Sequence, residues 1–169
     1  GWSKPSVLGS LLSVILAALG IVAVRRDSIL FALRVAPPVP GGGLLFPSYV
    51  LNHSFLDCDT FVSLSKIKDH TTTGVTLSMK NCFGNIPTTI YGDHVPKDRP
   101  DERPRSGRNF VFHDGLRQPA SPAAPEIDPA SPRHEGYRIP RVVVDICAAR
   151  PIDLAILDGI DTMGGTEGP

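Results

Sequence analysis

The chain has 169 residues, of which 41% are hydrophobic and 20% charged, and its formal net charge is zero at pH 7. This length allows one domain with a modest core. A neutral chain lacks the basic surface of nucleic-acid-binding domains, so we expect no nucleic acid partner. The three cysteines, Cys58, Cys82 and Cys147, have neither zinc nor iron–sulfur spacing. We therefore expect buried free thiols, no metal site and no iron–sulfur cluster on this chain.

Residues 1–35 form an apolar N-terminal segment. From Val7 to Val24 the chain has about 18 uncharged, mostly apolar residues, and Arg25 and Arg26 follow. This length is the lower limit for a membrane-spanning helix, which would make the protein membrane-associated. The alternative is a buried helix and strand belonging to an α/β domain of a cytoplasmic protein. Both interpretations remain open.

Residues 36–169 are expected to form a partial α/β domain. Its sheet would be open, mixed or mostly parallel, with covering helices. A proline- and glycine-rich stretch at 37–43 separates it from the apolar N-terminus. We predict an extended segment at 44–51, a loop at 52–59, an apolar strand at 61–65 and a short helix at 74–83 that ends at Gly84.

A long proline-rich loop is predicted at 92–139, because eight of the 17 prolines lie there and Pro140 follows directly. Few apolar residues accompany them, so we expect no core there. Its histidines are either solvated or part of a lid over a ligand. After the loop we predict a helix at 141–150 and a buried strand at 152–157, which brings Asp158 and Gly159 to its carboxyl end. The first residue is Gly and a glycine-rich loop is the last element, so we expect an incomplete domain.

Basic and hydroxyl groups follow the strand predicted at 61–65. Lys66 and Lys68 alternate on an extended chain and would point the same way. Thr76 and Lys80 would lie one turn apart on the predicted helix. Backbone N–H groups at a helix N-terminus, hydroxyls and ammonium groups suit phosphate or carboxylate. The candidate ligand-binding residues are Lys66, Lys68, Thr71, Thr73, Gly74, Thr76, Lys80, Asn81 and Gly159. The alternative is a solvated lysine face with threonines that cap the helix.

Two residues are candidates for proton transfer. His70 follows Asp69 and could act as a general base, and Asp158 would approach from the second strand end. No serine or cysteine nucleophile motif accompanies them. The alternative is that Asp158 is a solvated acid.

The stretch LDCDTFVSLSKIKDHTTTGVTLSMKNCFGNIP and the later ARPIDLAILDGIDTMGGTEGP resemble the domain of unknown function numbered 362, over roughly residues 40–169. The match includes the lysine pair, the His-Thr-x-x-Gly-x-Thr run, the Lys-Asn-x-x-Gly helix end and the later Asp-Gly and Gly-Pro pairs. Members are bacterial and archaeal, and some carry ferredoxin-type iron–sulfur modules. The resemblance implies an α/β fold, no established activity and a ferredoxin-type partner. Members usually have more chain on both sides, which implies a fragment.

The function expected from these patterns is binding of a small anionic ligand, a phosphate or carboxylate, at the strand ends. Some members of the family carry ferredoxin-type modules, which suggests an enzyme that assists redox or group-transfer chemistry, with an unknown cofactor. The alternative is a non-catalytic, membrane-tethered binding or scaffold protein.

Overall fold

The computed structural model describes residues 34–101, 103 and 107–165. The chain divides into two units, Gly1–Arg34 and Val35–Pro169. The segment at 7–24, for which a membrane span or a buried unit is predicted, lies outside the described residues. Within the described part, no helix has the length and apolar character needed to cross a membrane.

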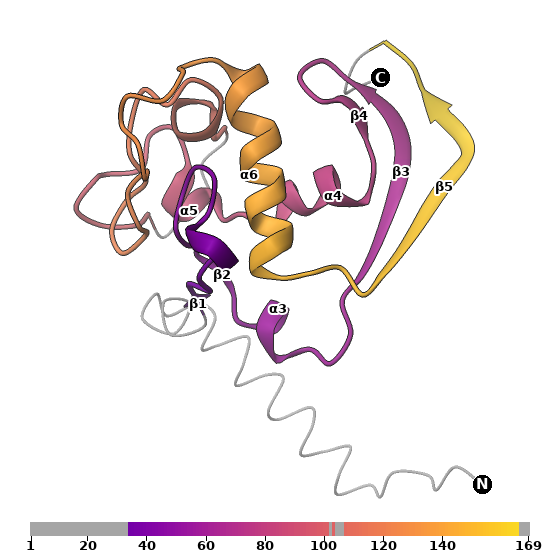
Figure 1. Ribbon diagram of the computed structural model, residues 1–169, viewed down its shortest axis with the longest axis horizontal. Helices are drawn as coiled ribbons and strands as arrows, with labels where there is room; N and C mark the ends of the chain where they lie inside the picture. The colour runs from indigo at the N-terminus through magenta and orange to yellow at the C-terminus, as the bar shows by residue number, and fades with distance from the viewer. Residues whose placement is uncertain (1–33, 102, 104–106, 166–169) are drawn as a thin grey trace, which may run out of the picture. The chain divides into compact units, whose positions relative to one another are not determined.

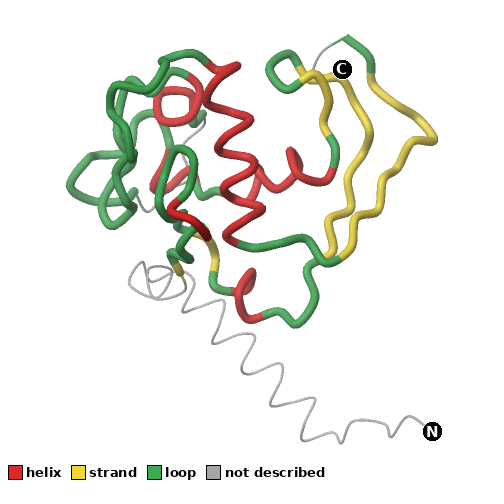
Figure 2. Tube along the Cα trace, in the orientation of Figure 1, coloured by secondary structure: helices red, strands yellow, loops and turns green. Residues whose placement is uncertain are grey.

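The elements of the described chain form two small sheets and several helices (Figures 1 and 2). In chain order they are β1 (Arg34–Val35), η1 (Pro40–Gly42), β2 (Leu51–Asn52), α3 (Ser54–Asp57), β3 (Val62–His70), β4 (Gly74–Thr76), α4 (Ser78–Asn81), η2 (Cys82–Asn85), α5 (Thr88–Tyr91), η3 (Asn109–His113), α6 (Glu135–Ala149) and β5 (Leu154–Met163). Strands β1 and β2 pair, and the other three strands form a sheet of order β4–β3–β5. Strand β3 pairs antiparallel with β4 and parallel with β5. The predicted α/β fold with an open mixed sheet is confirmed.

Strand β3 is longer than predicted and has an unusual alternation. Ser63 and Ser65 are buried, and their hydroxyls contact Ser78 of α4. Val62 and Leu64 alternate with them and are exposed. Because successive strand residues point to opposite faces, the serines face α4 and the apolar side chains face away from it.

The predicted helix at 74–83 is wrong in its first half. Gly74–Thr76 is strand β4, in register with Lys68 to His70 of β3. The backbone of Gly74 has φ 76°, a left-handed conformation that commonly follows a short hairpin turn. The β-branched residues Val75 and Thr76 favour the strand. Only Ser78–Asn81 is α-helical, and the 3₁₀ turn η2 follows directly.

The predicted buried strand at 152–157 is also wrong in its burial and its end. Strand β5 is an edge strand that continues to Met163, and it is mostly exposed, with Ile160 91% exposed. Asp158 and Gly159 therefore lie inside β5 and not at its carboxyl end. The register changes from Lys66 opposite Asp158 to Lys68 opposite Met163. The extra residues on β5 form an irregularity of the β-bulge type.

Helix α6 provides one wall of the hydrophobic core. It begins at Glu135, earlier than predicted, with Pro140 inside it, and His134 Nδ1 accepts a hydrogen bond from the backbone N–H of Tyr137 at the N-cap. The helix packs Ile139, Val142 and Ile146 into the core. The expectation of no core in the predicted loop before α6 is wrong, because that loop contributes Val111 and Phe112 to the same core.

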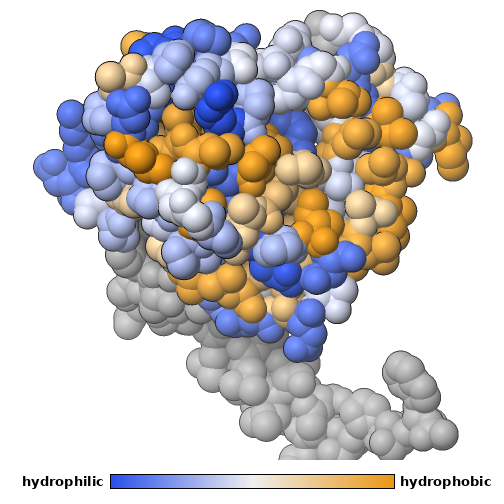
Figure 3. Space-filling view, viewed as in Figure 1, coloured by the Kyte–Doolittle hydropathy of each residue, from blue (hydrophilic) through white to orange (hydrophobic). Residues whose placement is uncertain are grey.

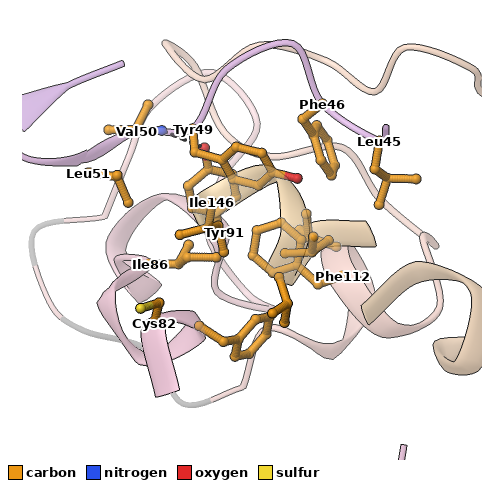
Figure 4. Close-up of a cluster of buried hydrophobic side chains, with 14 of the residues drawn as sticks. Leu45, Phe46, Tyr49, Val50, Leu51, Cys82, Ile86, Tyr91, Phe112 and Ile146 are labelled. Carbon is orange, nitrogen blue, oxygen red and sulfur yellow. Dashed lines mark hydrogen bonds between the residues drawn. The ribbon is translucent and has the colours of Figure 1, made fainter. Parts of the chain in front are cut away.

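The segment between α5 and α6 has few regular elements but contributes to the core centre. Val111 and Phe112 of η3 are fully buried. The Phe112 ring lies 4.9 Å from that of Tyr91 and 5.8 Å from that of Phe46, centroid to centroid (Figure 4). A single aromatic side chain can bury a large apolar area, so few apolar residues suffice to anchor a long segment.

Two buried carboxylates fix the irregular backbone around this core. Asp145 of α6 accepts hydrogen bonds from the backbone N–H groups of Leu44, Leu45 and Phe46 and from the Tyr49 hydroxyl. The carboxylate of Glu126, on the loop before α6, accepts hydrogen bonds from side chains instead, those of Ser131, Arg133 and Arg138. The bonds to Asp145 satisfy backbone N–H groups that have no partner in a helix or sheet.

Candidate functional site

The structure places the predicted site residues in separate parts of the molecule. Lys66 and Asp158 lie on the sheet face that points away from α4. His70, Thr71, Thr73 and Gly74 form the β3–β4 hairpin turn. Lys80 and Asn81 lie on α4, on the other side of the sheet. The remaining three are Lys68 and Thr76, which are in register on β3 and β4, and Gly159, which lies in the irregular part of β5.

Lys66 and Asp158 meet as an ion pair. Lys66 Nζ lies 2.7 Å from Asp158 Oδ2, and the two side chains are 41% and 43% exposed. The hydrogen bond from Lys66 lowers the pKa of Asp158, and a hydrogen bond from the Ile160 backbone acts in the same direction. A carboxylate with a lowered pKa is a weaker base, so this geometry does not favour proton transfer by Asp158.

His70 closes the hairpin turn. It is 5% exposed, and its Nδ1 accepts hydrogen bonds from the backbone N–H groups of Thr72 and Thr73 at 3.1 and 3.2 Å. Thr73 Oγ1 donates to the carbonyl of Val75. The lone pair of Nδ1 thus accepts hydrogen bonds from the backbone of the turn, and this nitrogen stabilises the turn.

The hairpin turn meets the start of α6 at Glu135. A hydrogen bond from His113 lowers the pKa of the Glu135 carboxyl, and the Thr72 hydroxyl contributes in the same direction. The distance from His113 Nδ1 to Glu135 Oε2 is 3.1 Å. Glu135 thus connects the β3–β4 turn, η3 and α6, although the three segments are far apart in the sequence.

An open cleft lies between β4, α4, α6 and β5 and has a volume of about 370 Å³. Its lining is mostly apolar: Val75, Leu77, Ser78, Met79, Lys80, Val143, Ala155 and Leu157. Hydrophobic side chains also gather at the surface on the β5 side of the molecule (Figure 3). The sequence did not predict this cleft. Its local signal is the alternation of the apolar residues Val75, Leu77 and Met79, which indicates an extended chain with one apolar side.

Lys80 is the charged residue of the cleft lining. It is half-buried, and its ammonium lies 4.9 Å from the centroid of the Phe83 ring. Asn81 next to it donates from Nδ2 to the Leu64 carbonyl at 3.4 Å. That hydrogen bond attaches the end of α4 to β3 and so holds Lys80 at the cleft. Lys80 is the one predicted ligand-binding residue that lines the cleft.

Metal ligands do not gather in the described part of the chain: no group of three His, Cys, Asp or Glu side chains there is arranged to hold an ion. The cleft therefore offers a ligand apolar contacts and the ammonium group of Lys80.

Comparisons with known proteins place the chain in a family. Neither the curated proteins nor the solved structures contain a match to it. A family model described as "Domain of unknown function (DUF362)" matches residues 16–169, which is most of the chain. The chain therefore belongs to this family.

Proposed function

We propose that this domain binds a small organic anion with an apolar body and a carboxylate or phosphate group, in the cleft between β4, α4, α6 and β5. The observation that carries the proposal is the combination of an apolar cleft of about 370 Å³ with Lys80 in its lining. Ligand pockets are typically concave, mostly apolar and provided with a few polar groups that orient the ligand. This cleft has that composition at the small end of the usual range of volumes.

The apolar body of the ligand would contact Val143 of α6, Leu77 and Met79 on the α4 side, and Ala155 and Leu157 of β5. Each such contact removes apolar surface from water, at about 25 cal/mol per Å². Exposed Met79 and Leu157 gain most, because they are 45% and 44% exposed without a ligand.

The anionic group would contact the Lys80 ammonium. The low-dielectric wall around Lys80 strengthens its attraction for a carboxylate or phosphate relative to bulk water. A charge-assisted hydrogen bond of this kind contributes about 1.5–3 kcal/mol when it is shielded from solvent. Because the cleft is open, we expect the lower end of that range.

This proposal keeps the ligand class expected from the sequence and moves its contact from Lys66 to Lys80. Lys80 lines the cleft, whereas Lys66 lies on the opposite face of the sheet and His70 holds the hairpin turn. An enzymatic role in redox or group-transfer chemistry and a ferredoxin-type partner stay predictions from the family resemblance.

The proposal is tested with ligands that separate the apolar body from the charge. Hexanoate and hexyl phosphate have both, 1-hexanol has the body alone, and acetate and inorganic phosphate have the charge alone. We expect the full chain to bind hexanoate or hexyl phosphate more tightly than either type of partial ligand, as measured by titration calorimetry or by a shift in melting temperature.

Two variants locate the site. Lys80→Gln should weaken hexanoate binding about tenfold, which corresponds to about 1.4 kcal/mol, and leave 1-hexanol binding unchanged. Ala155→Phe should fill the cleft and abolish binding of both. Lys97→Gln is the matched control, because Lys97 is exposed and does not line the cleft. Binding that is absent in the native chain, or equal in all three variants, would overturn the proposal.

A further inference from the structure

Two cysteines that are far apart in the sequence meet beside α4. Cys82 is the first residue of η2, and Cys147 lies in α6. Cys82 Sγ donates to the Ser78 carbonyl at 3.3 Å, and Cys147 Sγ donates to the adjacent Met79 carbonyl at 3.8 Å. Because Ser78 and Met79 are consecutive residues, these two hydrogen bonds hold the thiols close together. Two neighbouring thiols are the starting point for a disulfide.

We propose that Cys82 and Cys147 are a reversible redox site, which forms a disulfide between η2 and α6 when the protein meets a small aliphatic disulfide. Both residues belong to the region where η2 and α6 pack together, and Cys147 packs at the margin of the core that contains Cys82. The inference is independent of the ligand proposed for the cleft.

The exposure of the two thiols sets the order of the steps. Cys147 is half-buried and Cys82 is 2% exposed. Deprotonated Cys147 attacks one sulfur of the small disulfide, a mixed disulfide forms, and one thiolate leaves. Cys82 then loses its proton and attacks the Cys147 sulfur, and the second small thiolate leaves. Two protein thiols are oxidised and one small disulfide is reduced to two thiols, so the electrons balance.

The interaction between the two thiols affects the rate of the first step. It lowers the pKa of Cys82 and, together with burial, raises the pKa of Cys147. The attacking species is the thiolate, so a raised pKa leaves little of it at neutral pH. Oxidation should therefore become faster as the pH rises.

Cys58 provides an internal comparison. Its Sγ donates to the Phe55 carbonyl at 3.5 Å, and Arg150 Nη2 lies 3.5 Å from the same sulfur. Neither of the other two cysteines takes part in these contacts. Cys58 should therefore form only a mixed disulfide with the small reagent and no disulfide with another cysteine of the chain.

The test incubates the full chain with bis(2-hydroxyethyl) disulfide, alkylates the remaining thiols and maps the disulfides by mass spectrometry. We expect a Cys82–Cys147 cross-link in the native chain and in Cys58→Ser, and its loss in Cys82→Ser and Cys147→Ser. Dithiothreitol should reverse it. A native chain that gives a cross-link through Cys58, only mixed disulfides, or no reaction of Cys82 would overturn the proposal.

A second measurement does not depend on the variants. Closing a loop between residues 82 and 147 restricts the unfolded chain, so the oxidised protein should melt higher than the reduced protein, by roughly 5–15 °C. A cross-linked protein that melts at the same or a lower temperature would show that the two thiols must leave their native positions to react. That result would contradict a site prepared by the fold.

Discussion

Glu126 and Arg138 allow a direct test of how the long segment before α6 is held. Both side chains are fully buried, and Glu126 Oε1 lies 2.6 Å from Arg138 Nη1. Ser131 Oγ donates to the same carboxylate oxygen, and Arg133 Nη1 lies 2.5 Å from the other oxygen. We predict that Glu126→Gln destabilises the protein strongly, because it leaves the Arg138 guanidinium buried without a compensating charge.

The magnitude follows from the burial of the pair. Removing one partner of a buried ion pair costs about 3–5 kcal/mol. Arg138 keeps its hydrogen bonds to Ser131 Oγ and to the Val111 carbonyl in this variant, so we expect about 3 kcal/mol. For a domain of this size, that loss lowers the melting temperature by roughly 10 °C.

The assay is urea unfolding followed by far-UV circular dichroism, with Glu135→Gln as the matched control. Glu135 also pairs with a base, His113, but its side chain is 53% exposed. Solvent replaces such an interaction easily, so the control should lose less than about 1 kcal/mol. Equal losses in the two variants would refute the reasoning.

A double-mutant cycle separates the pair from its surroundings. Replacing both residues, as in Glu126→Leu with Arg138→Met, removes both charges and can restore apolar packing. We expect the double variant to be more stable than the sum of the two single losses predicts. Strict additivity would show that the two charges do not act as a pair.

Because of this pair, the free energy of unfolding should depend on pH. Burial by itself raises the pKa of Glu126, but hydrogen bonds from Arg133, Arg138 and Ser131 outweigh it and lower the pKa in the folded protein. The carboxylate therefore stabilises the fold fully above the unfolded pKa of about 4.3, and this contribution is lost as the pH falls through the lower folded value.

The remaining predictions concern this acid dependence, the second buried carboxylate and the hairpin turn. Glu126→Gln should show a smaller loss of stability between neutral pH and about pH 3 than the native chain in the same urea titration; an unchanged pH profile would contradict this. Asp145→Asn should lower the free energy of unfolding by about 2–4 kcal/mol, because it removes the carboxylate that accepts hydrogen bonds from three backbone N–H groups. Tyr49→Phe removes only one donor to that carboxylate and should lower it by about 1 kcal/mol. Gly74→Ala should cost roughly 1–2 kcal/mol because of its positive φ, whereas Gly84→Ala, with open space around it and no such φ, should be neutral; equal effects in thermal melts would show that the turn does not require glycine.

Local patterns in the sequence were sufficient for the elements that depend on neighbouring residues. The apolar run at 61–65 predicted β3, the residues after Pro140 predicted most of α6, and the alternation of strands and helices predicted an α/β fold. These signals are local, because strand and helix periods are visible within about ten residues.

Other features of the chain were decided by contacts between distant segments. Residues 74–76 pair with β3 because the turn closed by His70 brings them there, which a helical interpretation of the same residues could not include. Strand β5 is apolar, as a buried strand would be, but most of its side chains are exposed. Burial depends on what packs against a segment, and composition alone does not specify this.

The candidate site shows the same division. The sequence identified Lys66 and Lys80 as candidate ligand-binding residues and Asp158 as a candidate for proton transfer, since their chemistry is independent of the fold. Only the tertiary structure paired Lys66 with Asp158, 92 residues away, and placed Lys80 in an apolar cleft formed by four separate elements. A cleft is a property of the surfaces that remain after packing, and those surfaces exist only once the chain has folded.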